Sequence, residues 1–407
     1  MTRRLSLAAV AVFLWPIVLA PIGGASAADK HYGPGVTDTE VKIGQTMPYS
    51  GPASGYASVG ITEQAYYKMI NEQGGVNGRK INLISLDDGY SPPKTVEQTR
   101  RLVESEQVLA IVGALGTAAN TAIHKYLNDR KVPQLFISTG ATKWGDPKRF
   151  PWTMGWQPNY QTEARIYARY ILQHAPDARI GVLYQNDDYG KDYLTGFRDG
   201  LGDQADKMIV KVTSYEVTDP TVDSQIVSLQ AAGATLFFNI ATPKFSAMAI
   251  RKVFDIGWRP IQIVDSVGSS TGAAMKPAGF ERTQGIISAH YQKDATDPRW
   301  KDDPGMREFL DFMAKRVPTV DVGDSGSYNG YNIARTFVQV LQQCGDELTR
   351  ENLMRQAADL HDLALPMLLP GIKVNTSPTN FYPVNEMQLV RFEGDGWLLF
   401  GDVISGL

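Results

Sequence analysis

The chain has 407 residues, with 40 Lys and Arg against 43 Asp and Glu, a net charge of −3 at pH 7 and a single cysteine. This length predicts two domains rather than one. The mildly acidic balance, without any block rich in Lys or Arg, argues against a nucleic-acid partner, and one cysteine excludes an intramolecular disulfide.

The N-terminus has the pattern of a secretory signal peptide. Two arginines precede an apolar run from Leu5 to about Ile22, which leads into Ala25, Ser26 and Ala27. An uncleaved membrane anchor is the alternative, but the run is short for a membrane span and contains two prolines. We therefore expect a cleavable signal peptide over residues 1–27 and a periplasmic protein.

From Val41 onward, short β-rich runs alternate with amphipathic helical stretches, which indicates a parallel sheet covered by helices. The first array of about four strands is expected to have strands at 41–47, 80–86, 108–112 and 134–137, and helices at 58–72, 93–104 and 118–128. The segment 151–158, rich in Pro, Gly and Trp, is interpreted as a crossing strand or linker.

A second array of the same kind follows. Its expected helices are 160–173, 191–201, 221–232 and 245–256, and its expected strands are 179–184, 208–212, 236–240 and 261–264. Two such arrays in tandem predict two similar lobes.

The tail departs from this tandem pattern. After a strand at 286–289 come helices at 304–314, 328–343 and 351–358, interpreted as late cover for the first lobe. The runs 387–392 and 397–400 predict an antiparallel hairpin.

No assembled catalytic or metal site is found in the sequence. The five histidines lack metal-ligand spacing, and none accompanies a Gly-x-Ser-x-Gly elbow or a reactive cysteine. Adjacent aspartates such as Asp87 and Asp88 are interpreted as solvated residues. We expect no cofactor, metal or catalytic residue, and an enzyme that uses the interlobe cleft is a remote alternative.

Two loops carry the pattern of an anion site. One strand runs into residues 113–117, with Thr117 as the expected helix N-cap, and the next runs into residues 138–142. Both loops lie at the carboxyl ends of parallel strands, where hydroxyls and helix-start N–H groups suit a carboxylate. Alternatively, Thr117 only caps its helix and residues 138–142 form an ordinary turn.

Aromatic residues in loops are the second ingredient of a site. Tyr56, Tyr189, Trp144 and Trp156 stand at expected strand ends, where they can clamp an apolar or aromatic ligand, although each alone is more often a packing residue. Trp152 is interpreted as core.

The order of these features resembles the leucine/isoleucine/valine-binding protein family, the type I periplasmic binding proteins of ABC importers. The residues that carry the resemblance are Ser50-Gly51-Pro52 with Tyr56, Asn71-Glu72 with Gly74 to Gly78, Leu86 to Asp88, the two loops, and Asp188-Tyr189-Gly190. The resemblance extends over essentially the whole mature chain.

The resemblance implies an α/β fold with two similar lobes, each a mostly parallel sheet sandwiched by helices, joined by three crossovers, with ligand trapped by hinge closure. The lobes are expected at 28–157 with 290–372, and at 158–289 with 373–407. The implied partners are a small carboxylate ligand and the permease subunits of an ABC importer. The protein is expected to be a monomer with only peripheral contact to that membrane complex.

The resemblance also implies a site. The carboxylate falls at 115–117 and 140–142, with side-chain contacts from Tyr56, Tyr189 and Thr242. The expected ligand-binding set is Tyr56, Leu115, Gly116, Thr117, Ser138, Gly140, Ala141, Thr142, Trp156, Tyr189, Thr242 and Val267.

Two departures from the family pattern affect this expectation. Tyr90 and Gly116 occupy the positions of a disulfide, and Val267 stands where an acid pairs with the ligand ammonium, with Asp265 two residues earlier. An amino acid would then bury an unpaired cation, which is costly. The expectation is an aromatic acid of benzoate or phenylpropenoate type, with a branched-chain or other amino acid as the alternative.

Overall fold

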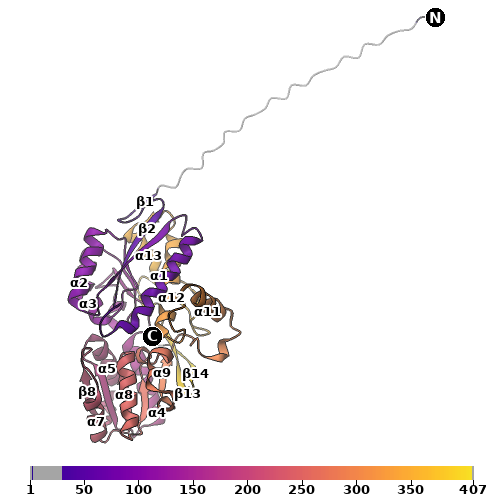
Figure 1. The fold of residues 1–407 in the computed structure, drawn as a ribbon. Coiled ribbons are helices and arrows are strands. Elements are labelled where there is room, and N and C mark those ends of the chain that lie inside the picture. The colour runs from indigo at the N-terminus through magenta and orange to yellow at the C-terminus, as the bar shows by residue number, and fades with distance from the viewer. Residues whose placement is uncertain (1, 3–29, 406–407) are drawn as a thin grey trace.

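The computed structural model describes residue 2 and residues 30–405, so the expected signal peptide, apart from residue 2, lies outside the part of the chain that it describes. Figure 1 shows two lobes placed end to end, with the early strands and helices in one and the middle of the chain in the other.

The first lobe contains a five-stranded parallel sheet of order β3-β2-β4-β5-β6. Its strands are β2 (Glu40–Met47), β3 (Lys80–Asp87), β4 (Ile111–Val112), β5 (Gln134–Ile137) and β6 (Thr153–Gly155). The short β1 (His31–Tyr32) pairs separately with β12 (Glu347–Leu348). The segment 151–158, expected to cross between the lobes, contains a fifth strand, β6. Its backbone pairs with β5 before the chain leaves the sheet.

The second lobe contains a seven-stranded sheet of order β14-β13-β11-β10-β9-β7-β8. Its parallel strands are β7 (Ile180–Gln185), β8 (Ile209–Tyr215), β9 (Leu236–Ile240), β10 (Ile261–Val264) and β11 (Ile287–His290). The hairpin of β13 (Glu386–Glu393) and β14 (Gly396–Ser405) adds antiparallel strands at one edge, as the sequence predicted.

Helices cover both sheets. In the first lobe they are α1 (Ala57–Glu72), α2 (Pro92–Arg100), α3 (Thr117–Asp129), α11 (Pro304–Arg316), α12 (Ser325–Cys344) and α13 (Arg350–Ala357). In the second they are α4 (Tyr160–His174), α5 (Asp188–Leu201), α6 (Ala205–Met208), α7 (Asp223–Ala231), α8 (Pro243–Asp255), α9 (Lys276–Ala278) and α10 (Phe280–Thr283).

The central strands are buried on both faces, which explains their sequences. All residues of β5 and of β9 are buried, and both strands are mostly apolar runs rather than alternating ones. A strand covered by helices on both sides requires such a run. The late helices do cover the first lobe, since α12 packs along α1 with the rings of Tyr66 and Tyr331 5.2 Å apart.

The chain passes between the two sheets three times, which confirms the expected pair of lobes joined by three crossovers. The crossings follow β6, follow β11, and connect α13 to β13. Each lobe therefore contains segments that are distant in sequence.

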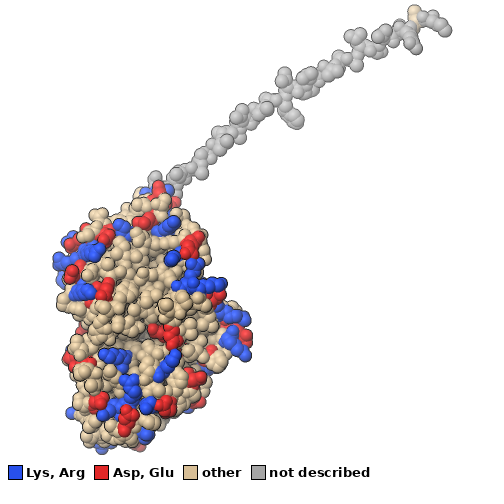
Figure 2. Space-filling view, viewed as in Figure 1, with Lys and Arg blue, Asp and Glu red and all other residues tan. Residues whose placement is uncertain are grey.

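The surface shows no charge of one sign gathered over a lobe in the view of Figure 2, where acidic and basic side chains are interspersed. Of the helices that the structure describes, none combines the length and apolar character needed to cross a bilayer.

Candidate functional site

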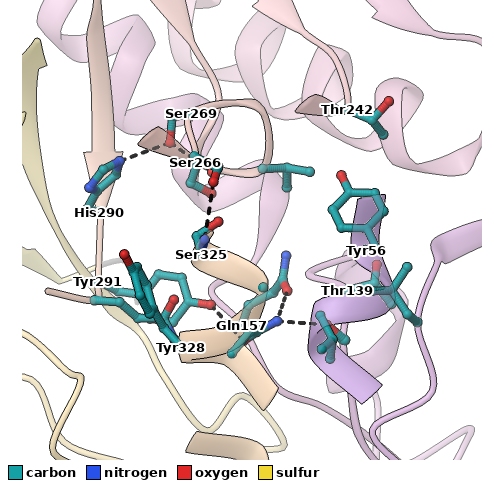
Figure 3. A pocket seen from close by; sticks show the side chains of 18 of the residues that line it. Tyr56, Thr139, Gln157, Thr242, Ser266, Ser269, His290, Tyr291, Ser325 and Tyr328 are labelled. Carbon is teal, nitrogen blue, oxygen red and sulfur yellow. Dashed lines mark hydrogen bonds between the residues drawn. The ribbon is translucent and has the colours of Figure 1, made fainter. Parts of the chain in front are cut away.

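A cavity of about 920 Å³, including its opening to solvent, lies between the lobes. Its walls come from the carboxyl ends of strands in both sheets, from the start of α3 and α12, and from the second crossing. Figure 3 shows Tyr56, Thr139 and Thr242 along one side of this cavity and His290, Tyr291 and Tyr328 along the other.

The first-lobe wall is formed by the turn into α3. Gly116 has φ +100°, a conformation that favours glycine, and a Cβ there would lie 2.8 Å from the ring of Tyr90. The prediction that Thr117 caps this helix is wrong, because Gly116 forms the turn and Thr117 is the first helical residue. Among the described residues no side chain caps α3, so its first N–H groups face the cavity without a side-chain acceptor.

The hydroxyl of Thr117 ends a chain of hydrogen bonds. Gln157 Nε2 donates to the Tyr160 hydroxyl (3.2 Å), which donates to Thr139 Oγ1 (3.3 Å), and Thr139 Oγ1 lies 2.6 Å from Thr117 Oγ1. Thr139 Oγ1 also accepts from Trp144 Nε1 at 3.5 Å. With two donors already directed at its oxygen, Thr139 gives its single hydrogen to Thr117. The Thr117 hydrogen is then left to bind an acceptor in the cavity.

Two further hydroxyls on this side are available as donors. Tyr56 lines the cavity with its oxygen buried and without a partner in the described chain, and burial raises its pKa well above the ordinary tyrosine value. Ser138 Oγ accepts from Asn329 Nδ2 at 2.7 Å, which leaves its own hydrogen free. Three hydroxyl hydrogens and the uncapped start of α3 are therefore available as hydrogen-bond donors in one cavity.

The second-lobe wall is a short 3-10 turn, Ser266–Gly268, fixed from behind by Glu163. This buried carboxylate accepts from the N–H and the hydroxyl of Ser266, both at 2.7 Å, and from the hydroxyls of Tyr167 (2.7 Å) and Tyr193 (2.8 Å). These four hydrogen bonds occupy the acceptor positions of the Glu163 carboxylate, so it has none left for a ligand. The turn presents Val267 to the cavity.

Asp265 does not line the cavity. It is fully buried, its Oδ2 accepts from the Tyr189 hydroxyl at 2.5 Å, and its Oδ1 accepts from the N–H of Gly268 at 3.1 Å. Burial raises its pKa well above the ordinary carboxyl value. Asp265 holds the Tyr189 ring against the cavity and offers no exposed negative charge to it.

The remaining lining groups include one cation and one anion. Lys293 is buried and its Nζ is engaged, since it donates to Asp303 Oδ1 (2.7 Å) and to the carbonyl of Pro366 (2.9 Å). Asp294, on the opposite side from Tyr56, accepts from the hydroxyls of Thr271, Thr296 and Tyr328. The donors that this cavity leaves available to a ligand are therefore uncharged.

Eight of the twelve expected ligand-binding residues line the cavity: Tyr56, Leu115, Gly116, Thr117, Ser138, Tyr189, Thr242 and Val267. The other four, Gly140, Ala141, Thr142 and Trp156, do not. Gly140 packs under Pro158, where a Cβ would lie 2.2 Å from its carbonyl, and Ala141 is buried. Trp156 is fully buried against the ring of Phe136.

Thr142 has a different role, because it joins the lobes. Its N–H and hydroxyl both donate to Asp192 Oδ2 on α5, at 2.7 and 2.9 Å. Nearby, Lys143 Nζ lies 2.5 Å from Asp188 Oδ2. Across the cavity, the N–H of Gly272 donates to the carbonyl of Gly323 at 2.8 Å. The two lobes are in contact on both sides of the cavity.

Sequence reasoning missed much of the lining. Thr139 lies inside an expected loop, and the length of that loop does not show which hydroxyl points inward. Gln157 and Tyr160 belong to the first crossing and the helix after it, and residues 290–294 to the second crossing. The resemblance predicted the crossings, and their proximity to the cleft was a usable signal for these residues.

Comparison with known proteins gives the family. The family model described as "Periplasmic binding protein" matches residues 40–396. The chain belongs to the periplasmic binding protein family. It is thus a solute-binding protein of the class that serves ABC-type transport, a class without enzymatic activity. Groups of His, Cys, Asp and Glu able to hold a metal ion are not found among the described residues of this periplasmic binding protein.

The chain is similar to two curated relatives and to two solved structures. "Leu/Ile/Val-binding protein homolog 7" of Brucella abortus is 24% identical over 72% of this chain and 74% of its own length. "Leu/Ile/Val-binding protein homolog 1" of the same organism is 25% identical over 71% of this chain and 75% of its own.

The structures are similar in fold. A branched-chain amino acid ABC transporter protein of Thermus thermophilus with bound valine has a TM-score of 0.81 at 14% identity, covering 91% of this chain and 97% of its own. A fatty acid ABC transporter substrate-binding protein of Thermomonospora curvata has a TM-score of 0.76 at 22% identity, covering 92% and 95%. The fold of this periplasmic binding protein therefore accompanies chemically different ligands.

Proposed function

We propose that this protein captures an aromatic carboxylate of benzoate or phenylpropenoate type and delivers it to the permease of an ABC importer. The observation that carries the proposal is the pairing of an uncapped α3 and the free Thr117 hydroxyl with Val267 on the facing wall. The site is equipped for an anion and lacks a counter-charge for an ammonium beside it.

The carboxylate is held by the donors of the first lobe. The positive end of the α3 dipole and its free N–H groups attract an anion, and the hydroxyls of Tyr56, Thr117 and Ser138 each have a hydrogen to give. Because the cation of Lys293 is engaged with Asp303, these neutral donors supply the binding.

The ring of the ligand lies among aromatic and apolar side chains. Six tyrosines line the cavity, at positions 56, 90, 160, 189, 291 and 328, together with Val59, Leu115 and Val267. Offset or edge-to-face contacts between rings add about 0.5–1.5 kcal/mol each to the burial of apolar area. An aliphatic side chain gains the burial term alone.

The amino-acid alternative is favoured by one specific observation, the names of the relatives, which are homologues of Leu/Ile/Val-binding protein. Such a ligand places its ammonium within one bond of the carboxyl-bearing carbon. Val267 and the engaged Asp265 offer no charge at that point. Burying the ammonium unpaired opposes binding by several kcal/mol.

A thermal-shift comparison of phenylalanine with 3-phenylpropanoate tests the proposal, because the two acids share ring and carboxylate and differ in the ammonium. A ligand of the folded state raises the melting temperature according to its concentration relative to its Kd. We expect 3-phenylpropanoate, 4-hydroxybenzoate and coumarate to stabilise the protein more than phenylalanine, leucine or valine. Stabilisation by leucine or phenylalanine alone refutes the aromatic-acid proposal in favour of the alternative.

We also propose that the chain is exported with residues 1–27 removed, on the basis of the signal pattern ending at Ala27. The intact mass of the protein recovered from the periplasm tests this. A mass that retains the first 27 residues refutes it.

A further inference from the structure

The cavity has a second polar end that the binding of a carboxylate does not use. It is formed by the second crossing, residues 290–294, and by the Ser269–Thr271 segment. In Figure 3, His290, Tyr291 and Tyr328 lie on the side opposite Tyr56, Thr139 and Thr242. A ligand anchored by its carboxylate at α3 directs its other end here.

The second end holds an unpaired donor. Gln292 is 9% exposed and lines the cavity, and its Nε2 is buried without a hydrogen-bond partner in the described chain. An unmade hydrogen bond at a buried amide costs about as much as a bond contributes, and often more. Among the described residues that line the cavity, Tyr56 and Gln292 are the two with a buried polar atom that has no partner. Gln292 directly follows Tyr291, which Figure 3 shows on the side opposite Tyr56.

The same end holds acceptors. Ser269 Oγ donates its single hydrogen to the carbonyl of Ser266 at 2.9 Å, so its 2.9 Å contact with His290 Nε2 requires the imidazole to donate there. Burial lowers the pKa of His290 to about 4, which keeps the ring neutral and leaves Nδ1 as an acceptor. Asp294 Oδ2 accepts from the Thr271 hydroxyl and has capacity for another donor.

A second anion is not what this end fits. The helix α12 also starts at the cavity, but the Asp324 side chain caps it by accepting from the N–H of Gly326 at 2.9 Å, and the N–H of Ser325 donates to Ser270 Oγ at 3.2 Å. With Asp294 beside it and the charge of Lys293 paired with Asp303, this end repels a carboxylate. One donor with nearby acceptors matches a neutral hydroxyl, which both accepts and donates.

We propose that the ligand carries a hydroxyl group on its ring opposite the carboxylate, and that Gln292 donates to this hydroxyl while His290 or Asp294 accepts its hydrogen. This inference rests on the proposed function, since the carboxylate must be held at α3 for the far end of the ring to reach Gln292. It names the ligand class as para-hydroxylated aromatic acids.

Calorimetric titration with 4-hydroxybenzoate and 4-methylbenzoate tests the proposal, because the methyl group fills the same space without hydrogen bonding. The wild-type protein should bind the hydroxy acid about tenfold or more tightly. In Gln292→Met this preference should fall to near parity, while affinity for the methyl acid is kept. Titration with 4-coumarate and 4-methylcinnamate repeats this comparison for acids with a longer spacer between the ring and the carboxylate.

Gln262→Met is the matched control. Gln262 lies on β10, its Oε1 is also buried without a partner in the described chain, and it does not line the cavity. Its variant should retain the full preference for the hydroxy acid. Because no hydrogen bond within the described residues involves the Gln292 side chain, the Gln292→Met variant should fold. If it does not fold, the affinities of the wild-type protein for the hydroxy and methyl acids still decide whether the ligand hydroxyl is recognised.

The outcomes separate this inference from the proposed function. Equal wild-type affinity for the hydroxy and methyl acids overturns the inference and leaves the proposed function standing. A preference that persists in Gln292→Met shows that another residue binds the hydroxyl, and overturns the assignment. If no aromatic acid binds while amino acids do, the proposed function fails and the inference with it.

Discussion

Asp192 Oδ2 accepts two hydrogen bonds from Thr142, one from its N–H at 2.7 Å and one from its hydroxyl at 2.9 Å. Thr142 follows a strand of the first lobe and Asp192 lies on α5 of the second, so this pair of bonds joins the two lobes. We expect these bonds to form only when the lobes approach and thereby to link ligand capture to closure.

Asn at position 192 should weaken this link. Asp192→Asn keeps an acceptor oxygen but removes the charge that strengthens both bonds. We expect ligand affinity to fall about fivefold to tenfold, roughly 1 kcal/mol, mainly through faster dissociation measured by stopped flow. Asp199→Asn is the control, because Asp199 also lies on α5 but pairs with Arg165 of its own lobe. Equal dissociation rates in all three proteins would exclude the link.

Closure should be visible as compaction. If the contacts on both sides of the cavity belong to the closed form, small-angle scattering should give a smaller radius of gyration with saturating ligand than without it. The crossings near residues 156–158, 290–293 and 371–375 should carry the change in backbone angles. An unchanged radius at saturation rules out hinge closure.

Thr117→Val tests the anion site. The substitution keeps the shape and removes the hydroxyl whose hydrogen is free for the ligand. We expect carboxylate binding to weaken by about 1.5–3 kcal/mol, measured by calorimetry. Thr99→Val is the control, because Thr99 is also buried, its hydroxyl has no partner in the described chain, and it lies outside the cavity. Full affinity in Thr117→Val would place the carboxylate elsewhere.

Val267→Glu tests the missing counter-charge. A carboxylate on the cavity wall should repel the ligand anion and attract an ammonium. We expect affinity for 3-phenylpropanoate to fall more than tenfold and affinity for phenylalanine to rise, measured by the same thermal-shift series. A parallel loss for both acids would mean that Val267 does not adjoin the position of the ammonium.

His124 should make the protein sensitive to acid. It packs between Trp144 and Phe150, and burial, with Lys143 and Arg149 nearby, lowers its pKa from 6.5 to about 4. Between these values the unfolded chain binds the proton and the folded one does not, so stability falls as pH falls from about 6.5 to 4. His124→Phe should reduce the slope of unfolding free energy against pH in this window by up to about 1.4 kcal/mol per pH unit. Identical slopes would refute this.

The strands were the most predictable part of the fold. The expected bounds of 134–137, 236–240 and 261–264 match β5, β9 and β10, because each is a β-rich run bounded by turn residues. Helix starts were less accurate. The start of α5 was expected at 191 but lies at Asp188, since Asp187 accepts from the N–H groups of Tyr189 and Gly190 and begins the helix earlier.

The site was predictable only where it follows strand ends. Leu115, Gly116, Thr117 and Ser138 come directly after buried strands, and the position of the strands fixes them. Beyond that, a loop has no periodicity that shows which side chain faces inward. Thr139 enters the cavity network while Thr142, three residues later, bonds to the other lobe. Gln292 depends on a crossing whose path is decided by both lobes together.

Two of the four hydrogen bonds that Glu163 accepts, those from the N–H and hydroxyl of Ser266, fasten the Ser266–Gly268 turn to α4, the first helix after the first crossing. If the lobes close by a hinge, this wall of the cavity moves as one body with α4. Exchange of the half-buried side chain at 267 should therefore alter which molecules are accepted and leave the hydrogen bonds of Glu163 in place. A protein built in this way can change its ligand by single substitutions on one wall of the cavity, while its hinge and its outer surface stay the same.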